Sequence, residues 1–192
     1  MRVLGISGSL RRESYNTQLL RAAAQLLPSG AELVLLDPEL LRAVPAYDDD
    51  VQASGEAPPS VARLREEIAQ ADGVLFATPE YNSSIPGFLK NALDWVSRPL
   101  ASSPLKGKDV AVVGASTGMF GAVWAQAELR KVLAAIGARV VDRELPVMTA
   151  AEAFGDGDLL ADREQHEQLA AHVEALVDAA RITAGEQLQP AA

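Results

Sequence analysis

The N-terminal part of the chain contains a loop, residues 7–16, whose small and polar residues are suited to holding an anion. Its sequence, Ser-Gly-Ser-Leu-Arg-Arg-Glu-Ser-Tyr-Asn, lies between an apolar run and an amphipathic segment. Small residues let backbone N–H groups converge on one point, and the dipole of a helix that follows favours negative charge there. The hydroxyls of Ser9 and Ser14 and the amide of Asn16 add donors. The pattern predicts a phosphate-binding loop. The alternative is an ordinary N-cap and turn that begin a helix.

Two common nucleotide-binding motifs do not describe this loop. A Walker loop ends in Gly-Lys-Ser or Gly-Lys-Thr, and that lysine is missing here. A dinucleotide fingerprint needs the spacing G-x-G-x-x-G, which Gly5 and Gly8 do not make. The expected ligand is therefore a phosphate group held mainly by small residues and hydroxyls.

A second polar loop, residues 78–87, precedes the sequence Lys-Asn-Ala-Leu-Asp-Trp at residues 90–95. Its prolines restrict the backbone, while Tyr81 and Asn82 offer an aromatic wall and a polar edge. Such a surface suits a planar heterocycle, because small-molecule sites combine apolar walls with a few oriented polar groups. A rigid turn without a ligand is the alternative.

The third loop, residues 114–121, contains a G-x-S-x-G pattern centred on Ser116, which is the nucleophile elbow of α/β-hydrolases. The order Ser, Asp, His is completed by two candidate aspartates and two candidate histidines: Asp156, Asp158, His166 and His172. Both histidines fall in a Glu-rich helical segment, and nothing else in the sequence prepares an oxyanion hole. A hydrolase is therefore the third-ranked hypothesis for this chain.

The elements that must position these loops alternate between short apolar runs and longer amphipathic segments. Strands are predicted at residues 2–6, 32–36, 73–78, 109–114 and 138–142. Helices are predicted around residues 19–27, 61–71, 88–96, 121–136 and 162–182. Three of the strands are apolar on both faces, which is typical of parallel strands covered by helices above and below. The pattern predicts a doubly wound three-layer α/β domain, in which ligands lie beyond the carboxyl ends of the strands.

Composition narrows the possible functions further. The 192 residues include 17 basic and 26 acidic side chains, for a net charge of −9, and no cysteine. Disulfides, thiolate metal sites, iron–sulfur clusters and a cysteine nucleophile are therefore excluded, and no metal site is predicted. The acidic balance, without runs of Lys or Arg, argues against a nucleic-acid partner.

The organisation of the chain is simple. We expect a single domain over residues 1–185 and a flexible tail at 186–192, with a long connection at 43–60. No apolar stretch approaches the roughly 18 residues of a membrane span, and the N-terminus begins a strand directly. The expectation is a cytoplasmic protein with no membrane partner.

Together the three loops resemble those of the NADPH-dependent FMN reductase family, which includes bacterial quinone, chromate and azo-dye reductases. Residues 8–11, with Ser14 and Asn16, are similar to the phosphate loop of that family. The Pro-Glu-Tyr-Asn sequence at 79–82, followed by residues 90–95, is similar to its flavin-ring signature. This second match is long and specific, and it contributes most to the resemblance.

The resemblance covers about residues 3–141 and implies a flavodoxin-like fold: a five-stranded parallel sheet in the order 2-1-3-4-5, with helices on both faces. It implies FMN as cofactor and NAD(P)H as hydride donor, and a quinone or similar small molecule as acceptor in a ping-pong cycle. The protein would be an NAD(P)H-dependent FMN or quinone reductase in which flavin N5, and no side chain, performs the catalysis. The cofactor-binding positions carried over are Ser9, Arg11, Ser14, Tyr15, Asn16, Thr17, Pro79, Glu80, Tyr81, Asn82, Ser83, Ser116 and Gly118.

Three further expectations accompany this hypothesis. A flavodoxin-type electron carrier, which is also acidic and holds FMN, is the alternative function, ahead of a hydrolase that uses Ser116. A homodimer or homotetramer is predicted, because Trp95 and Trp124 lie on helices beside the proposed site, with burial in the core as the alternative. Many relatives have Gly-Gly where this chain has Gly121 and Ala122, so the extra methyl is expected to narrow the space over the flavin ring.

Overall fold

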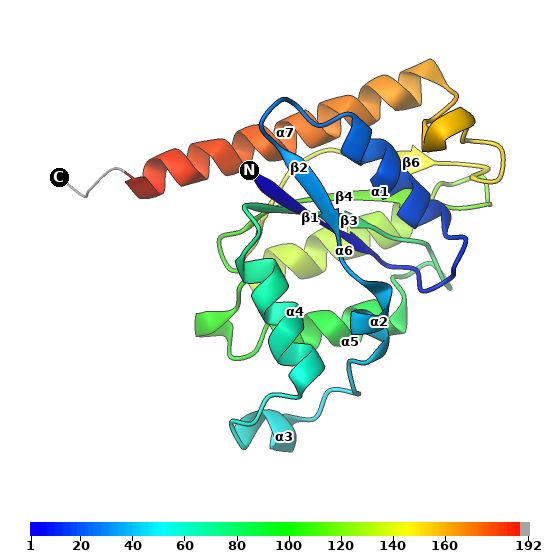
Figure 1. The fold of residues 1–192 in the computed structure, drawn as a ribbon. Coiled ribbons are helices and arrows are strands. Elements are labelled where there is room, and N and C mark those ends of the chain that lie inside the picture. The colour runs from blue at the N-terminus through cyan, green and yellow to red at the C-terminus, as the bar shows by residue number, and fades with distance from the viewer. Residues whose placement is uncertain (189–192) are drawn as a thin grey trace.

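The computed structural model describes residues 1–188 and shows a parallel sheet between two layers of helices (Figure 1). The sheet has the order β2-β1-β3-β4-β5, and a sixth strand, β6, pairs with the end of β4. The strands are β1 (Arg2–Ser7), β2 (Glu32–Leu35), β3 (Gly73–Ala77), β4 (Asp109–Ala115), β5 (Arg139–Val140) and β6 (Pro146–Val147). The predicted strand order is confirmed, and the fold is flavodoxin-like.

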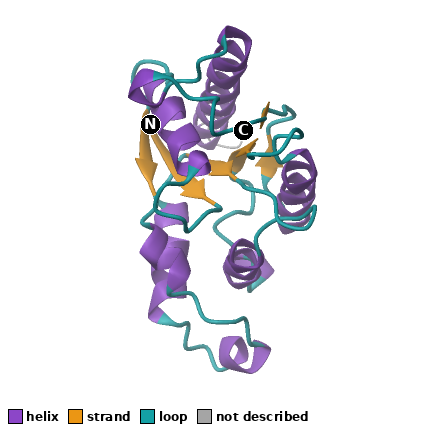
Figure 2. Cartoon of the chain, turned by 90° about the vertical axis from the view of Figure 1, so that its right-hand side faces the viewer, coloured by secondary structure: helices purple, strands orange, loops and turns teal. Residues whose placement is uncertain are grey.

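The helices divide between the two faces of the sheet (Figure 2). They are α1 (Tyr15–Gln25), α2 (Pro38–Arg42), α3 (Asp49–Ala53), α4 (Pro59–Ala69), α5 (Gly87–Val96), α6 (Val123–Ile136) and α7 (Arg163–Leu188), with short 3₁₀ turns at Leu100–Ser102 and Asp156–Asp158. Helices α1 and α7 pack on one face, where their leucines and valines join one hydrophobic cluster. Helices α2, α4, α5 and α6 supply the cluster on the other face. None of the helices within residues 1–188 is long and apolar enough to cross a lipid bilayer.

The three central strands explain why the polar loops meet. Every residue of β3 and β4 is buried, as is β1 from Val3 onward, since helices cover both faces. All three strands run parallel, with register pairs such as Ser7 with Ala77 and Ala77 with Val113. Their carboxyl ends therefore lie side by side, and the three loops predicted to carry chemistry begin at one edge of the sheet.

The structure differs from the sequence-based expectation in four places. The sheet has the additional strand β6, which is two residues long and too short for a periodic signal. The connection at 43–60 contains α3, which lies apart from the sheet at the bottom of Figure 1. Helix α2 follows β2 directly, with Asp37 as its N-cap and Pro38 in its first turn. Helix α7 continues to Leu188, so the chain remains helical beyond residue 185, and residues 189–192 of the expected tail lie outside the described residues.

Candidate functional site

A cavity of about 210 Å³ lies where the three loops meet, beyond the carboxyl ends of β1, β3 and β4. It brings together residues more than 100 positions apart in the sequence, and most of them are predicted cofactor-binding positions. The lining residues are Ser9, Arg11, Ser14, Tyr15, Asn16, Pro79, Glu80, Tyr81, Ala115, Ser116 and Thr117. We call this the cofactor cavity.

The first loop is shaped by its small residues and by the start of α1. Gly8 donates its N–H to the carbonyl of Ala77 at 2.7 Å, and a Cβ at this glycine would lie 3.0 Å from Leu89 and 3.3 Å from Pro79. Ser14 is the N-cap of α1, with its hydroxyl accepting from the N–H of Thr17 at 3.2 Å. The first turn of a helix leaves backbone N–H groups without intrahelical acceptors, so this end of the cavity can bind an anion.

Arg11 supplies the positive charge at this end. Its guanidinium lies 4.8 Å from the centre of the Tyr15 ring and donates to the carbonyl of Glu13. The Tyr15 ring in turn stacks parallel to Phe154 at 6.3 Å between centroids. The cation is therefore held beside the cavity by contacts with the aromatic ring and the loop backbone.

Asn16 has a structural role, a link between α1 and β4, that could not be inferred from the sequence. Its amide donates to the carbonyl of Ala115 at 2.9 Å and accepts from the N–H of Ala115 at 3.0 Å. The side chain is 3 % exposed, so both bonds form away from water. Asn16 thus joins the start of α1 to the end of β4 and fixes the distance between the first and third loops.

The second loop makes a tight turn that only partly faces the cavity. Tyr81 and Ser84 exchange backbone hydrogen bonds at 3.0 and 3.1 Å, and the central residues Asn82 and Ser83 have φ of 53° and 58°. Two central residues with positive φ are the mark of a type I′ turn, which favours Asn at the first position. Tyr81 and Pro79 line the cavity, whereas Asn82 and Ser83 are at the exposed tip.

Glu80 performs a role that sequence reasoning missed. Its carboxylate accepts from the N–H groups of Trp124 and Ala125, each at 3.1 Å, at the first turn of α6. The residue that precedes this helix, Ala122, has no side-chain acceptor of its own. Glu80 therefore caps α6 from a distant loop and locks the second and third loops together.

The third loop does not form a hydrolase site. The hydroxyl of Ser116 accepts from the N–H of Gly118 at 3.1 Å, which is a local turn. Both histidines lie on α7, and neither lines the cofactor cavity. His172 is buried beside Arg143 and Gln168 instead. The third-ranked hypothesis of a Ser-His-Asp triad is wrong, because the fold places its members at different sites.

Two other expectations are corrected by burial. Ala122 is 1 % exposed and belongs to the hydrophobic cluster under α6, so its methyl group packs in the core and does not face the cavity. Trp95 is 2 % exposed and is also a core residue, whereas Trp124 is 47 % exposed.

Of the remaining cofactor candidates, Thr17 donates to the hydroxyl of Ser7 at 2.9 Å and faces a neighbouring cavity. Gly118 lies outside the cofactor cavity.

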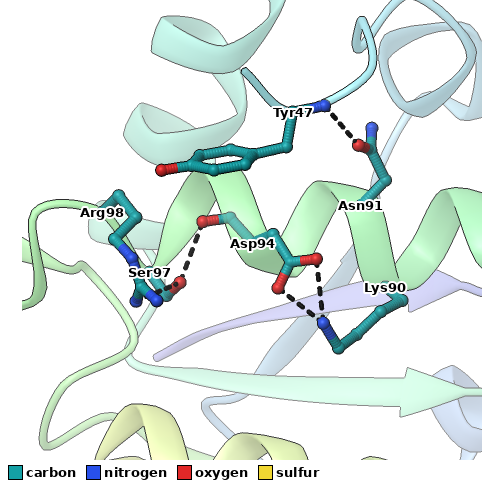
Figure 3. Close-up of polar contacts among 6 residues, drawn as sticks. All are labelled: Tyr47, Lys90, Asn91, Asp94, Ser97 and Arg98. Carbon is teal, nitrogen blue, oxygen red and sulfur yellow. Dashed lines mark hydrogen bonds and ion pairs between the residues drawn. The ribbon is translucent and has the colours of Figure 1, made fainter. Parts of the chain in front are cut away.

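The segment at residues 90–95 of α5, which resembles the family's flavin-ring signature, has a supporting role (Figure 3). Asn91 accepts from the N–H of Tyr47 at 2.7 Å and donates to the carbonyl of Pro45 at 2.8 Å. The indole of Trp95 donates to the same carbonyl at 2.9 Å. Lys90 and Asp94 form an i,i+4 ion pair at 2.7 Å. Asn91 and Trp95 thus attach the 43–60 connection to α5, whereas the Lys90–Asp94 pair lies within the helix. Only the Pro79–Tyr81 part of the resembling segment lines the cavity.

Replacement of Asn91 by alanine is expected to release this connection. The variant loses the two hydrogen bonds from α5 to the backbone of the 43–60 connection. Together these bonds stabilise the protein by about 1–3 kcal/mol. Cleavage by a low concentration of protease within residues 48–58 should become several-fold faster than in the wild type. A matched variant, Gln70→Ala, removes only an exposed side-chain contact with Glu66 and should leave the cleavage rate unchanged. Equal rates in the two variants would contradict this role of Asn91.

One titratable group whose pKa is shifted by the fold, His172, lies away from the cofactor cavity. Burial lowers the pKa of His172, which is 2 % exposed and whose Nε2 has no hydrogen-bond partner among residues 1–188. Nearby Arg143 and Arg130 lower the pKa further, while hydrogen bonds to backbone carbonyls oppose the shift. Its cavity is lined by Arg143, Glu144, Glu164, Glu167, Gln168 and Ala171.

This shift predicts a pH dependence of stability. Because the pKa of His172 in the folded protein lies below its unfolded value of 6.5, the unfolded chain binds more protons as the pH falls through this range. The contribution of the neutral His172 to the free energy of unfolding is therefore fully present above about pH 6.5 and is lost as the pH falls below this value. Urea denaturation at pH 7.5 and 5.0 should show a larger decrease for the wild type than for His172→Leu. His166→Gln, on the same helix, should retain the wild-type decrease.

The arrangement of loops agrees with the comparisons to known proteins. A family model described as NADPH-dependent FMN reductase matches residues 1–152, which include all three loops. The chain belongs to this family. An NAD(P)H-dependent FMN reductase of Pseudomonas aeruginosa is 44 % identical over 92 % of this chain and 93 % of its own length. A quinone reductase of Escherichia coli K12 is 41 % identical over 74 % of each chain.

The solved structures show the same similarity. The flavoenzyme FerB of Paracoccus denitrificans, an NAD(P)H:acceptor oxidoreductase, has 37 % sequence identity and a TM-score of 0.81. The match covers 94 % of this chain and 97 % of FerB. Family membership therefore rests on sequence and on fold together, and the resemblance predicted from the loops is confirmed.

Proposed function

We propose that this protein is an FMN-dependent NAD(P)H oxidoreductase that reduces a quinone or a similar small acceptor. The observation that carries the proposal is the convergence of an anion-binding loop, an aromatic wall and a turn that carries Ser116 and Thr117 in one cavity of a family member. The relatives named quinone reductase support a quinone acceptor, including a 2-hydroxy-1,4-benzoquinone reductase of a Burkholderia species that is 44 % identical.

The residues present fit FMN. The phosphate would be held by the hydroxyls of Ser9 and Ser14, the guanidinium of Arg11 and the N–H groups at the start of α1. The ring edge would lie against Pro79 and Tyr81, with Ser116 on the third loop across the cavity. The hydroxyl of Ser14 caps the N–H of Thr17 at the start of α1. The other backbone N–H groups of this first turn have no acceptor within the helix and are donors for the phosphate.

The chain contributes binding and orientation. When bound, FMN supplies the redox chemistry, since it accepts a hydride from NAD(P)H and passes electrons to the acceptor. The exposed Tyr81 and the small residues around Ser116 leave one side of the cavity open, so that nucleotide and acceptor would use the same place in turn. We propose on this basis that the reaction is ping-pong, which steady-state kinetics with parallel double-reciprocal lines would support.

The test begins with the purified protein. It should bind FMN in a 1:1 ratio, turn yellow, and oxidise NAD(P)H in the presence of a quinone. An electron carrier of the flavodoxin type would also bind FMN, but it would oxidise almost no NAD(P)H without a partner protein. Failure to bind FMN at micromolar concentration would overturn the proposal.

We also propose that two or four copies associate around the cofactor cavity. A volume of about 210 Å³ is smaller than the 300–1,000 Å³ typical of small-molecule sites, so one chain encloses the cofactor incompletely. Exposed apolar side chains border the same edge of the sheet: Tyr81, Met119, Phe120, Trp124 and Met148. Phe120 and Trp124 already contact each other with centroids 4.8 Å apart. A second copy seated on this surface would cover it and complete the wall.

Light scattering tests the association. The wild type should have at least twice the mass of one chain at micromolar concentration, and Trp124→Glu should lower it. A monomeric wild type with full FMN affinity would contradict the proposal.

We also propose that the reaction takes place in the cytoplasm, where NAD(P)H is present. Cell fractionation of the tagged protein tests this location.

A further inference from the structure

A second, larger cavity lies on the other side of the first loop. It has a volume of about 520 Å³ and is bounded by β1, β2, the start of α1 and the short helix α2. Because β1 lies between β2 and β3, the loop that follows β1 separates this cavity from the cofactor cavity. Ser9 and Arg11 line both. We call it the arginine cavity. Its volume is within the range of sites that hold drug-sized ligands.

The charge of this cavity is opposite to that of the whole protein. Four arginines from three parts of the chain line it, against a single carboxylate, although the protein has a net charge of −9. The arginines are Arg11 and Arg12 on the loop, Arg21 on α1 and Arg42 on α2. Such a concentration of guanidinium groups in an acidic protein indicates a site for an anion.

The arginines differ in how far the protein already satisfies them. Arg42 is held in place, with its guanidinium 3.2 Å from Glu39 and 3.1 Å from the carbonyl of Leu10. Arg21 lies 3.9 Å from Asp158, and its side chain is 57 % exposed. Arg12 makes no hydrogen bond or ion pair with any residue in the range 1–188, so its five donors are free for a ligand.

The rest of the lining is apolar or carries hydroxyl groups. Leu10, Leu35 and Leu36 form one wall, and Gly5 contributes a part of β1 without a side chain. The hydroxyls of Ser7 and Thr17, 2.9 Å apart, lie between this wall and the arginines. An apolar wall beside guanidinium groups matches a purine nucleoside that carries a phosphate.

We propose that the arginine cavity binds the adenosine 2′-phosphate end of NADPH, and that Arg12, Arg21 and Arg42 select NADPH over NADH. The proposal rests on the proposed function, because NADPH must then reach the neighbouring cofactor cavity with its other end. The 2′-phosphate is the chemical difference between the two nucleotides, and guanidinium groups recognise it by paired charge-assisted hydrogen bonds. The loop shared by the two cavities would direct the nucleotide from one to the other.

A binding experiment tests the cavity without turnover. Adenosine 2′,5′-bisphosphate is titrated by calorimetry into the FMN-loaded protein, with 5′-AMP and inorganic phosphate as comparators. The bisphosphate should bind on the order of tenfold more tightly than 5′-AMP, and the difference should shrink as salt is raised, since partly exposed charges are screened. Equal affinity for the two nucleotides would overturn the proposal. A preference for FAD over FMN would also overturn it, because the cavity would then hold the adenylate of the flavin.

Variants identify the residues. Arg12→Ala removes a side chain that makes no hydrogen bond or ion pair within the described part of the chain, so the fold should be retained, as a thermal melt can verify. It should weaken binding of the bisphosphate about fivefold to tenfold and raise KM for NADPH by a similar factor. Both kcat and the KM for NADH should remain unchanged. Arg42→Ala should act in the same direction. Arg63→Ala, an exposed arginine on α4 outside both cavities, is the charge-matched control and should change neither constant.

The outcomes separate this proposal from the proposed function. If the protein binds no FMN and oxidises neither nucleotide, the proposed function fails, and the same bisphosphate titration into the FMN-free protein still decides whether the cavity binds adenosine phosphates. If both nucleotides are oxidised with equal KM and the arginine variants behave like Arg63→Ala, the reductase stands and the assignment of this cavity is wrong.

Discussion

Gly121→Ala is expected to destabilise the protein by about 3–5 kcal/mol. Gly121 has a φ of +54°, a conformation that residues with a Cβ rarely adopt. A Cβ at this position would also lie 2.5 Å from the carbonyl carbon of Pro146 and 2.7 Å from its Cβ. These atoms belong to a backbone and a closed ring, which cannot move aside as a flexible side chain can. Urea denaturation measures the change in the free energy of unfolding.

The effect should extend to the cofactor cavity. Pro146 begins β6, which pairs with Gly114 and Ala115 at the end of β4, immediately before Ser116. A displacement of β6 therefore moves the third loop, and FMN affinity should fall together with stability. Gly87→Ala is the control, because nothing lies within 4 Å of a Cβ there and the residue is helical. A loss below about 1 kcal/mol in Gly121→Ala would show that the turn at 120–122 can adopt another conformation.

Asn16→Ala should have the second large effect, a loss of about 2–4 kcal/mol. The substitution leaves the N–H and the carbonyl of Ala115 unpaired in a place where the native side chain is 3 % exposed. It also breaks the only side-chain link described between the start of α1 and the end of β4. Because that link sets the distance between the phosphate loop and the third loop, FMN affinity should fall by about tenfold or more. Urea denaturation and fluorescence titration with FMN give the two values.

A comparison variant separates the two hydrogen bonds of Asn16. Asn16→Asp keeps an acceptor for the N–H of Ala115 but places a second carboxylate oxygen beside the carbonyl. This substitution should remain destabilising, since a buried charge next to a carbonyl is unfavourable. If Asn16→Ala retained wild-type stability and FMN affinity, the link would have no role in positioning the loops.

The elements predicted from periodicity correspond closely to the observed ones. Residues 74–77 and 110–113 are apolar without interruption, and both are buried in central strands. The pattern is readable because a strand covered on both faces must lose its polar residues. Gly137, the residue that follows the predicted helix at 121–136, ends α6 with a φ of +94°. The short elements α2, α3 and β6 were missed, because two to five residues contain little more than one period and cannot show a repeat.

The sequence positions that form the candidate site could be predicted, but the direction in which each side chain points could not. Ser9, Tyr81 and Ser116 reach the same cavity, as their places after adjacent strands indicate. Glu80 instead caps α6, and Asn16 joins α1 to β4, because both find backbone partners from distant parts of the chain. These partners are not visible in a linear sequence, since the separations are 44 and 99 residues. The contact of either residue with FMN remains a prediction.

The sequence by itself determined the layers, the strand order through its family resemblance, and the three loops at one edge of the sheet. Those features follow from local periodicity and from small residues placed after apolar strands, both of which are written along the chain. Only the tertiary structure decided which polar groups are satisfied by the protein and which stay free for a ligand. Arg12 and Arg42 illustrate this, because the cavity they line exists only when α2 folds back beside the first loop. Charge recognition depends on that spatial grouping, since guanidinium groups separated by 30 residues act together only when packing brings them to one place.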